Sequence, residues 1–351
     1  MKALKSLMLV AAAAGTMALI AETALAQDAA PAAPAAPAAA ATPDGAAPAS
    51  RGRGAGRGRG NFVPPPPELA WAPKKSPYDN YDAPNKAWWK LSDILKAHSK
   101  TASWQQPIVR NKDLAADWHQ LAVGAKDTLV EWPDNRVGMI VWSGQVRISI
   151  KGQEPFVASK GFEVNIPLRL PYTMETVGSE PALWLEVHQA GDVPIYPIEG
   201  TPDKPKDIKG YKFTKVILNG GDGVYDGNNK PYLDYYKDVV NGGARGGAFI
   251  ASDHFFMNNI RGMGVPMPPA SNLGHFHVDM TEFWFIMEGK ISYQIEGIKE
   301  PFIADAGDVV TAAMGRFHRA AFAEGQMDTR VAINPFPRGL HDYTPESQGR
   351  Q

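Results

Sequence analysis

The sequence predicts an all-β protein built from two similar β-barrels, with a short helix before the first barrel and a disordered N-terminal linker. Three observations predict this fold class. A β-rich segment recurs at an offset of about 145 residues, hydrophobic and polar residues alternate within it, and Gly 34 and Pro 30 supply turns while long helical patterns are few. Hydrophobic residues make up 44% and charged residues 21% of the chain, a globular composition that excludes a wholly disordered protein.

Residues 1–26 have the features of a bacterial secretory signal peptide. Lys2 and Lys5 precede an apolar run, and residues 24–26 form a small-x-small cleavage site before Gln27. A membrane anchor is the less favoured interpretation, because the run is short and no positive charge follows it closely. We therefore expect a periplasmic or secreted protein with no stable membrane span after signal cleavage.

Residues 27–66 form a predicted linker. Pro-Ala-Ala repeats are followed by the tract RGRGAGRGRG and by four consecutive prolines. No part of this segment has an apolar face that a fold could bury, so we expect disorder. We interpret the Arg/Gly tract as a spacer rather than an RNA-binding element, because it has no aromatic side chains on which bases could stack.

Charge and cysteine content exclude several kinds of site. The formal net charge is −1, so the overall field of the protein does not favour nucleic acid. We expect a small-molecule substrate, no nucleic-acid partner, and a homodimer as the candidate assembly. Cysteine is absent, which excludes disulfides, iron–sulfur clusters and thiolate ligands. Any metal must be bound by His, Asp or Glu.

The segment Asn85–His98 is the clearest candidate for a helix. Its apolar side chains recur at helical spacing. One face of this predicted helix carries Trp88, Leu91, Ile94 and Leu95.

The internal repeat follows the predicted helix. GQVRISIKG at Gly144–Gly152 resembles GKISYQIEG at Gly289–Gly297, an offset of 145, and EPFVASKG at Glu154–Gly161 resembles EPFIADAG at Glu300–Gly307, an offset of 146. The near-constant offset predicts duplication of one β unit. Alternation within VRISI and ISYQI is typical of half-buried antiparallel strands.

The repeat leads to a division of the chain into four parts. The turn-rich tract Thr201–Gly247 is interpreted as the crossover and the early strands of the second unit. The predicted parts are a signal peptide at 1–26, a linker at 27–66, a first barrel without metal ligands at 67–200 and a second, metal-binding barrel at 201–345.

The second unit contains a group of candidate metal ligands. His275 and His277 stand at positions i and i+2, so on an extended segment both imidazoles point to the same side. Glu282 begins the next strand-like stretch, and His318 follows a predicted turn further on. Three imidazoles and one carboxylate suit one divalent transition metal, with iron, manganese or copper favoured and nickel or zinc as alternatives.

The spacing of these residues resembles that of the cupin superfamily, and the duplication resembles a bicupin. The cupin motifs are G-x5-H-x-H-x(3,4)-E-x6-G and G-x5-P-x-G-x2-H-x3-N. The matching positions are His275, His277, Glu282, Gly289, Gly307, Gly315 and His318, and the departing positions are Pro269, Ala313 and Phe322, none of which is a ligand. The resemblance implies a small jelly-roll barrel with the metal inside it on the four ligand positions.

The first unit lacks ligands at the corresponding positions. Counting from the matched glycines places Val130, Trp132, Val137 and Tyr172 where the second unit has its four ligands. We therefore expect the first barrel to bind no metal there and to pack against the second. The remaining histidines have no partners at ligand spacing and are interpreted as core or surface residues; they are His98, His119, His188, His254 and His341.

The residues after Glu282 suggest what surrounds the metal. Trp284 and Ile286 share the parity of Glu282, so they should face the barrel interior and make it apolar and aromatic. An interior of this kind favours an aromatic or other hydrophobic substrate. The equal alternative is that these side chains only fill the core of the barrel. Candidate polar residues for orienting a substrate are Tyr293, Arg316 and Lys290.

Three classes of function remain open at this point. The favoured one is a metal-dependent oxidoreductase with dioxygenase or oxidase chemistry on a small organic substrate. The second is a non-redox lyase, isomerase or decarboxylase in which the metal acts as a Lewis acid. The third is a non-catalytic periplasmic protein that binds a metal or a ligand. Fold resemblance alone does not decide among them.

The signal and linker predictions can be tested on protein expressed in a bacterial host. N-terminal sequencing of exported material should begin at or near Gln27, and limited proteolysis should cut the segment Arg51–Gly60 before any barrel strand. Exported protein that begins at Met1 would contradict signal cleavage, and protease resistance of the Arg/Gly tract would contradict disorder.

Overall fold

The computed structural model describes residues 69–198, 206–217, 223–225, 229–243, 246–251, 254–264, 272–323, 325–335 and 342–343. The chain divides into the units Met1–Gly52 and Arg53–Gln351, and every described residue belongs to the second. The predicted signal peptide, the linker and the boundary at residue 200 lie outside the described residues and stay predictions. No helix in the described part of the chain is long and apolar enough to cross a membrane.

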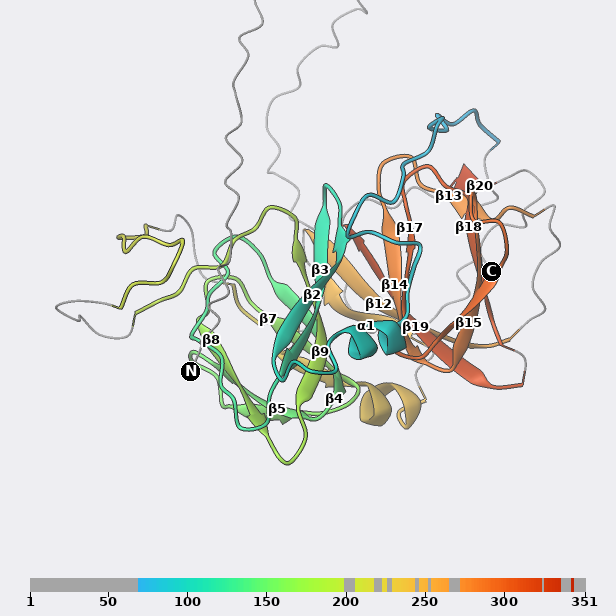
Figure 1. The fold of residues 1–351 in the computed structure, drawn as a ribbon. Helices are drawn as coiled ribbons and strands as arrows, with labels where there is room; N and C mark the ends of the chain where they lie inside the picture. Colours follow the sequence, from blue (N-terminus) through green and yellow to red (C-terminus); the bar gives the residue numbers. More distant parts are fainter. Residues whose placement is uncertain are drawn as a thin grey trace, which may run out of the picture. The chain divides into compact units, whose positions relative to one another are not determined.

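The second barrel is formed by two antiparallel sheets that face each other (Figure 1). One sheet has the strand order β17-β14-β19-β12 and the other has the order β16-β15-β18-β13. Eight strands in this order form the two interlocked Greek keys of a jelly roll. The strands are β12 (Phe255–Met263), β13 (His275–Phe276), β14 (Glu282–Glu288), β15 (Lys290–Ile295), β16 (Phe302–Asp305), β17 (Val309–Ala312), β18 (His318–Phe322) and β19 (Met327–Pro335).

The first barrel repeats this strand order. Its sheets run β7-β4-β9-β3 and β6-β5-β8. The counterpart of β13 is reduced to isolated bridges, Lys126↔Glu175 and Val130↔Tyr172. The strands are β3 (Leu114–Leu121), β4 (Val137–Ser143), β5 (Gln145–Ile150), β6 (Phe156–Ala158), β7 (Phe162–Ile166), β8 (Tyr172–Val177) and β9 (Ala182–Gln189). The predicted all-β fold with two similar jelly-roll barrels is confirmed.

Additional strands lengthen the sheets. β2 (Trp104–Arg110) pairs with β3, and β11 (Gly246–Ala251) pairs with β12 in the equivalent place. The short strand β20 (Asp342–Tyr343) pairs with β13. Each barrel in this way contributes five strands to one of the two six-stranded sheets.

The two barrels also exchange short arms. β1 (Trp88–Trp89) precedes the first barrel in sequence but pairs with β17 of the second. Conversely, β10 (Tyr232–Asp234) pairs with β7 of the first barrel. A helical turn follows each arm, α1 (Leu91–Ala97) after β1 and the π-helix η1 (Tyr235–Val240) after β10. Each arm therefore covers the edge strand of the other barrel, which would otherwise expose unpaired backbone groups.

The first of these arms corrects the predicted helix. Instead of a helix over Asn85–His98, the chain forms β1 and then a seven-residue helix in which Leu91 is buried and Leu95 is 39% exposed. The extended backbone is selected by tertiary contacts: Trp88 pairs with Val310, and its indole N–H donates to Asp308 Oδ2 at 2.8 Å. Strand pairing outweighs the helical spacing of the apolar residues.

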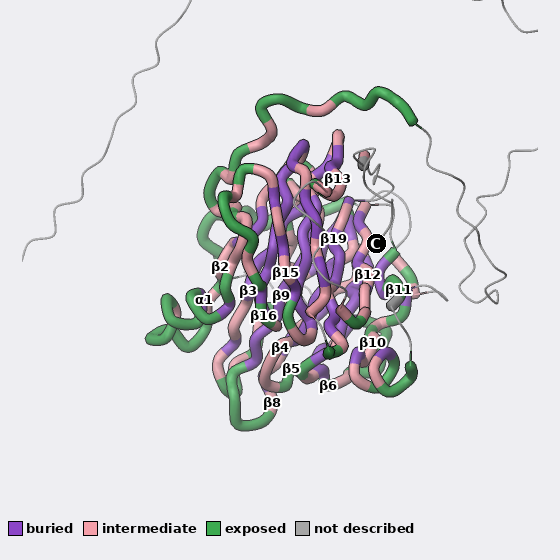
Figure 2. The backbone as a smooth tube through the Cα atoms, turned by 90° about the vertical axis from the view of Figure 1, so that its right-hand side faces the viewer, coloured by how far each residue is buried: buried purple, intermediate pink, exposed green. Residues whose placement is uncertain are grey.

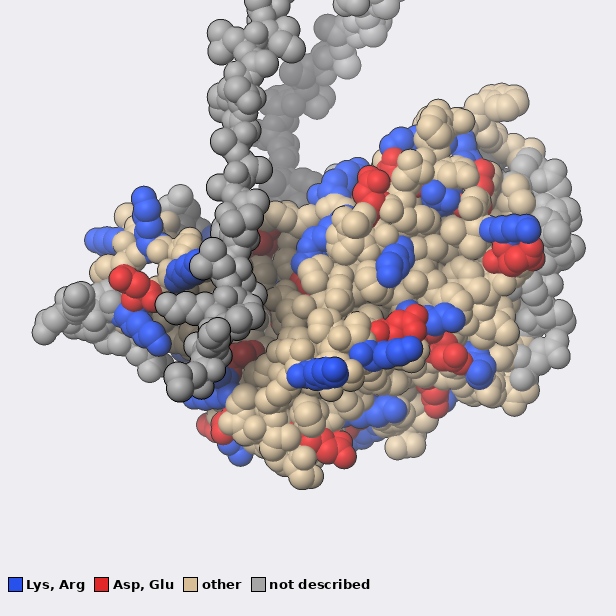
Figure 3. Space-filling model, viewed as in Figure 1, with Lys and Arg blue, Asp and Glu red and all other residues tan. Residues whose placement is uncertain are grey.

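Three clusters of buried side chains form the core (Figure 2). One fills each barrel, and the largest lies between the two six-stranded sheets. Alternate residues of β14 serve different clusters: Phe283 and Phe285 face the other barrel, whereas Trp284 and Ile286 face the interior of their own. This alternation confirms the parity predicted from Glu282. On the surface, Lys and Arg are interspersed with Asp and Glu over the face in Figure 3.

A fully buried carboxyl group lies in the contact between the barrels. Glu163 of β7 accepts a hydrogen bond at 2.8 Å from the side-chain amide of Asn259 on β12, and neither residue is more than 2% exposed. Burial raises the pKa of Glu163 to about 8, because the single hydrogen bond from Asn259 offsets only part of the desolvation. The folded protein therefore keeps this group protonated at pH values where the unfolded chain has released the proton.

We expect Glu163→Gln to change the pH dependence of stability. A raised folded-state pKa means that the wild-type protein loses stability as pH rises from about 4.5 towards 8, whereas the amide cannot ionise. Relative to the variant, the wild-type free energy of unfolding should fall by about 3 kcal/mol between pH 5 and pH 8. Urea unfolding at both pH values measures this, with the exposed Glu180→Gln as control. Parallel curves for wild type and Glu163→Gln would contradict a buried neutral carboxyl.

Candidate metal centre

The four predicted ligands come from three strands, or the turn beside one of them, at one end of the second barrel. His275 on β13 pairs directly with His318, the first residue of β18. Glu282 is the first residue of β14 and pairs with Ala312 of β17 in the opposite sheet. Gly274 allows the close approach of β13 to β18: its φ is +82°, and a side chain there would collide with the carbonyl oxygen of His318.

The donor atoms of these residues converge. The Nε2 atoms of His277, His318 and His275 lie 2.9, 3.3 and 3.9 Å from the same oxygen, Glu282 Oε2. All four donor atoms lie within 4.8 Å of one another, and no other group of three or more His, Asp and Glu in the described residues meets this criterion. Donors at such separations can share one ion.

Burial sets the protonation of the group. The side chains of His277, His318 and Glu282 are 1%, 3% and 6% exposed, whereas that of His275 is 20% exposed. Burial lowers the pKa of His275 to about 3 and also lowers that of His318, with Glu282 opposing the effect. Burial would raise the pKa of Glu282, but hydrogen bonding to the imidazoles holds it well below its usual range. Neutral imidazoles and an ionised carboxylate are the forms that bind metals.

Two further groups hold the ligands in place. The Nδ1–H of His318 donates to the carbonyl oxygen of Arg316 at 3.0 Å, which turns Nε2 towards the centre. The side-chain amide of Asn334 on β19 donates to Glu282 Oε1 at 3.1 Å, which leaves Oε2 for the shared position. Asn334 carries no signal in the sequence, because it stands 52 residues from Glu282 and matches neither motif.

The donor set fits a divalent transition metal. It offers three imidazole nitrogens and one carboxylate oxygen in a largely buried site, with His318 and Glu282 oriented by neighbouring groups. A buried ionised carboxylate is costly without a positive partner, and an ion at the shared position would supply one. The four predicted residues do converge on one position, and that they bind a metal ion stays a prediction.

Of the side chains predicted to surround the metal or orient a substrate, the structure places some inside the barrel and others outside it. Trp284 and Tyr293 face the barrel interior, with ring centroids 5.3 Å apart, and the Trp284 ring lies 5.3 Å from that of His318. Arg316 and Lys290 do not join them. The Arg316 guanidinium donates to the carbonyl oxygens of Asp79 and Glu296, and Lys290 forms an exposed ion pair with Asp305.

Arg330 of β19 is an interior group that sequence analysis missed. Its guanidinium carbon lies 5.6 Å from the centre of the Trp284 ring. It also partly offsets the effect of burial, which raises the pKa of Tyr293. Arg330 and Ala332 stand two residues apart on one strand, so their side chains point to the same side, and Ala332 belongs to the interior cluster. This alternation could have placed Arg330 inside the barrel from the sequence.

Aromatic packing replaces the metal ligands in the first barrel. Val130 pairs with Tyr172 as His275 pairs with His318, so the register counted from the glycines is correct. The indole N–H of Trp132 donates to the Tyr172 hydroxyl at 3.1 Å, and its ring lies 4.4 Å from that of His188. These side chains occupy the places that the ligands take in the second barrel.

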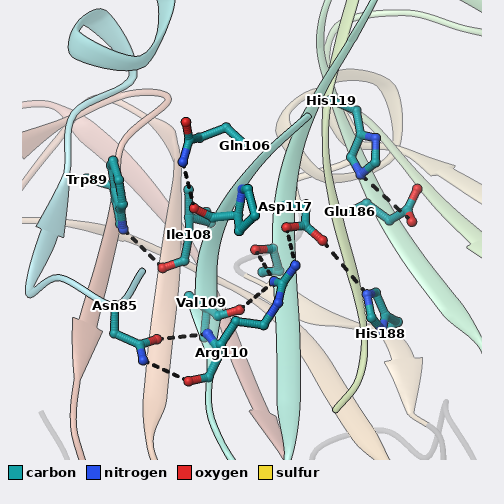
Figure 4. A network of polar contacts seen from close by, with 12 residues as sticks. Asn85, Trp89, Gln106, Ile108, Val109, Arg110, Asp117, His119, Glu186 and His188 are labelled. Carbon is teal, nitrogen blue, oxygen red and sulfur yellow. Dashed lines mark hydrogen bonds and ion pairs between the residues drawn. The ribbon is translucent and has the colours of Figure 1, made fainter. Parts of the chain in front are cut away.

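His119 and His188, which the sequence predicted to be core or surface residues, belong to a polar network on β3 and β9 (Figure 4). Asp117 lies 2.6 Å from an Arg110 nitrogen and 3.9 Å from His188 Nε2, while His119 Nε2 lies 4.0 Å from Glu186. Burial lowers the pKa of His188, but Asp117 and Glu186 outweigh it and raise the pKa overall. These contacts join neighbouring strands of one sheet. His341 lies outside the described residues.

Comparison with known proteins gave similarities in structure only. No family model and no curated protein matches the sequence. A structure of oxalate decarboxylase superposes with a TM-score of 0.45 and 15% identity, covering 74% of this chain and 79% of that chain. A cupin 2 conserved barrel domain protein from Leptotrichia buccalis gives a TM-score of 0.45 and 13% identity, covering 70% and 94%. Oxalate decarboxylase from Bacillus subtilis at pH 4.6 gives 0.41 and 14%, covering 74% and 78%.

The fold assignment depends on the strand order of the two barrels and on the ligand motif. Both barrels are double-sheet jelly rolls. The strand order is that of a double-sheet jelly roll in each case, and the ligand residues stand on the strands and at the spacings that the cupin resemblance implies.

Removing a donor should release the metal. We expect His277→Ala and His318→Ala each to weaken metal binding by more than about 100-fold, because changes outside the ligand shell already cost about 10- to 100-fold. Glu282→Gln should lower occupancy less, because the amide oxygen can still coordinate. Elemental analysis of purified variants, beside circular dichroism, measures the effect. His98→Ala is the control, since His98 stacks on Trp104 of β2, which extends the sheet of the first barrel. Full occupancy in His318→Ala would refute its role as a ligand.

Proposed function

We propose that the protein is an exported, metal-dependent oxidoreductase that uses dioxygenase or oxidase chemistry on a small organic substrate, with an aromatic one favoured. The observation that carries the proposal is a convergent set of three histidines and one glutamate beside an apolar and aromatic barrel interior. Export is proposed from the predicted signal peptide alone. The assembly proposed is a homodimer, acting without nucleic acid.

The number of donors would leave coordination positions of a bound ion free for substrate. Four protein ligands would leave open positions on an ion that prefers five or six, and a redox-active ion bound there would supply electron transfer to dioxygen. The more exposed side chain of His275 marks the side of the group that solvent and substrate reach, since the other three donors are almost fully buried.

The side chains around the donors would bind and orient the substrate. Trp284 and Ile286 present an apolar wall directly behind Glu282, and this wall excludes water from the reacting groups. Asn334 holds Glu282 by a hydrogen bond, so the carboxylate keeps its orientation when substrate enters. The hydroxyl of Tyr293 and the guanidinium of Arg330 offer the interior hydrogen-bond donors to a polar substituent of the substrate.

Metal replacement separates this function from its alternatives. Protein purified with its native metal, identified by elemental analysis and EPR, should consume dioxygen with phenolic or other aromatic substrates, and the zinc-reconstituted protein should not. Glu282→Gln should lower the rate more than it lowers occupancy, because loss of a negative charge makes a redox ion harder to oxidise. Lys290→Ala, which removes only an exposed ion pair, should leave uptake unchanged.

Two outcomes would contradict the proposal. Turnover retained with zinc would indicate a lyase, isomerase or decarboxylase in which the ion acts only as a Lewis acid. Tight metal binding without turnover of any substrate in the panel would indicate a non-catalytic metal- or ligand-binding protein.

A further inference from the structure

A segment of chain before the first barrel lies against the metal centre of the second. Residues 74–81, here called the strap, precede β1 and cross the loop at residues 313–317 that leads into His318 (blue in Figure 1). The cupin motifs do not include the strap, which stands about 200 residues before the first ligand in sequence.

The loop at 313–317 is bonded to the segments that carry the ligands. The backbone N–H of Gly315 donates to the carbonyl oxygen of His277 at 2.9 Å. The backbone N–H of Met314 donates to the hydroxyl of Thr281, the residue before Glu282, at 3.2 Å. The carbonyl oxygen of Arg316 accepts the hydrogen bond that orients His318. The position of this loop therefore fixes three of the four donors.

The strap contacts this loop mainly through Arg316. The guanidinium belongs to a residue that is 5% exposed, and it lies over the Tyr78 and Tyr81 rings, 4.0 and 4.6 Å from their centroids. Its Nε–H donates to the carbonyl oxygen of Asp79 at 2.9 Å, and the N–H of Asp79 donates back to the carbonyl oxygen of Met314 at 3.2 Å. A buried guanidinium over aromatic faces, with its N–H groups on carbonyl oxygens, is held far more firmly than a solvated arginine.

Lys74 of the strap makes a second set of contacts, with residues next to the ligands. Its ammonium lies 2.9 Å from Glu296 and over the rings of Phe276 and Phe317, 5.4 and 5.1 Å from their centroids. Phe276 stands between two ligands and Phe317 directly precedes a third. Gly315 permits the approach, because its φ is +84° and a side chain there would lie 3.1 Å from the Cβ of Lys75.

We propose that the strap is a working part of the metal centre: it positions the loop at 313–317, and through the Arg316 carbonyl the imidazole of His318, so that metal retention depends on it. Arg316 and Tyr78 are positioning residues and touch neither the ion nor the substrate. The proposal rests on the metal centre and not on the reaction, so it stands or falls independently of the oxidoreductase assignment.

The test is the release of Co²⁺ from the loaded protein into excess chelator. Tyr78→Ala and Arg316→Met should each accelerate release by about 10-fold, within the range that changes beside the ligands produce. The effects of the two changes should be less than additive in the double variant, because both remove the contact between the guanidinium and the Tyr78 ring. Tyr78→Phe keeps the ring and should restore the wild-type rate. The visible spectrum of bound Co²⁺ should shift in Tyr78→Ala while circular dichroism stays unchanged, since the coordination geometry changes and the fold does not.

A control variant and a replacement variant complete the Co²⁺ release experiment. Lys290→Ala, on the same barrel but away from the strap, should release Co²⁺ at the wild-type rate. If Tyr78→Ala fails to fold, Lys74→Gln replaces it and should still release Co²⁺ faster. Wild-type release rates and an unchanged Co²⁺ spectrum in the folded strap variants would overturn the proposal, and so would additive effects of Tyr78→Ala and Arg316→Met. A wild-type protein that retains no Co²⁺ would overturn the metal centre itself.

Discussion

The buried carboxylate of Glu282 is the interaction on which the arrangement of the second barrel depends. It is 5% exposed and stays ionised, and three imidazoles share one of its oxygens. Such a group is stable only where fixed partners surround it, because a buried charge without them costs several kcal/mol. The partners come from β13, β18 and the turn after β13. The Arg316 carbonyl orients one of them, His318, and Asn334 holds the other oxygen of Glu282. A rigid β framework provides this convergence better than loops would.

Duplication explains what the rest of the chain contributes. The first barrel keeps the strand order and the register of the second, but an indole, a phenol and two valines take the ligand positions. Its six-stranded sheet instead covers the back of the metal barrel through the largest apolar cluster. The exchanged arms β1 and β10 fasten each barrel to the other, so the chain that precedes the first barrel ends up supporting the site in the second.

The features of this structure that depend on local patterns could be predicted from the sequence. The alternation along β14 placed Trp284 and Ile286 inside, and the glycines set the register that puts Tyr172 opposite Val130. Four ligands at matched spacings were enough to find the donor set. All of these depend on the two-residue period of strands and on turns that demand positive φ, both of which are visible in a single sequence.

Contacts between distant segments could not be predicted in the same way. The helical spacing around Trp88 was misleading, because pairing with Val310 far along the chain decides its backbone. Arg316 stands next to Phe317 and His318, which suggested a pocket role, but Tyr78 and Asp79 draw its side chain to the strap. Asn334 reaches Glu282 only because β19 lies beside β14. Such pairings follow from topology and leave no periodic signal.

The central claim is that His275, His277, Glu282 and His318 bind one transition metal ion per chain. Anomalous diffraction from crystals of the native protein, collected at the absorption edge of the metal found by elemental analysis, tests it most directly. The account predicts a single strong peak per chain, about 2.0–2.2 Å from the three Nε2 atoms and a Glu282 oxygen. A peak at another group of residues, or an equal peak among Trp132, Tyr172 and His188 in the first barrel, would contradict it.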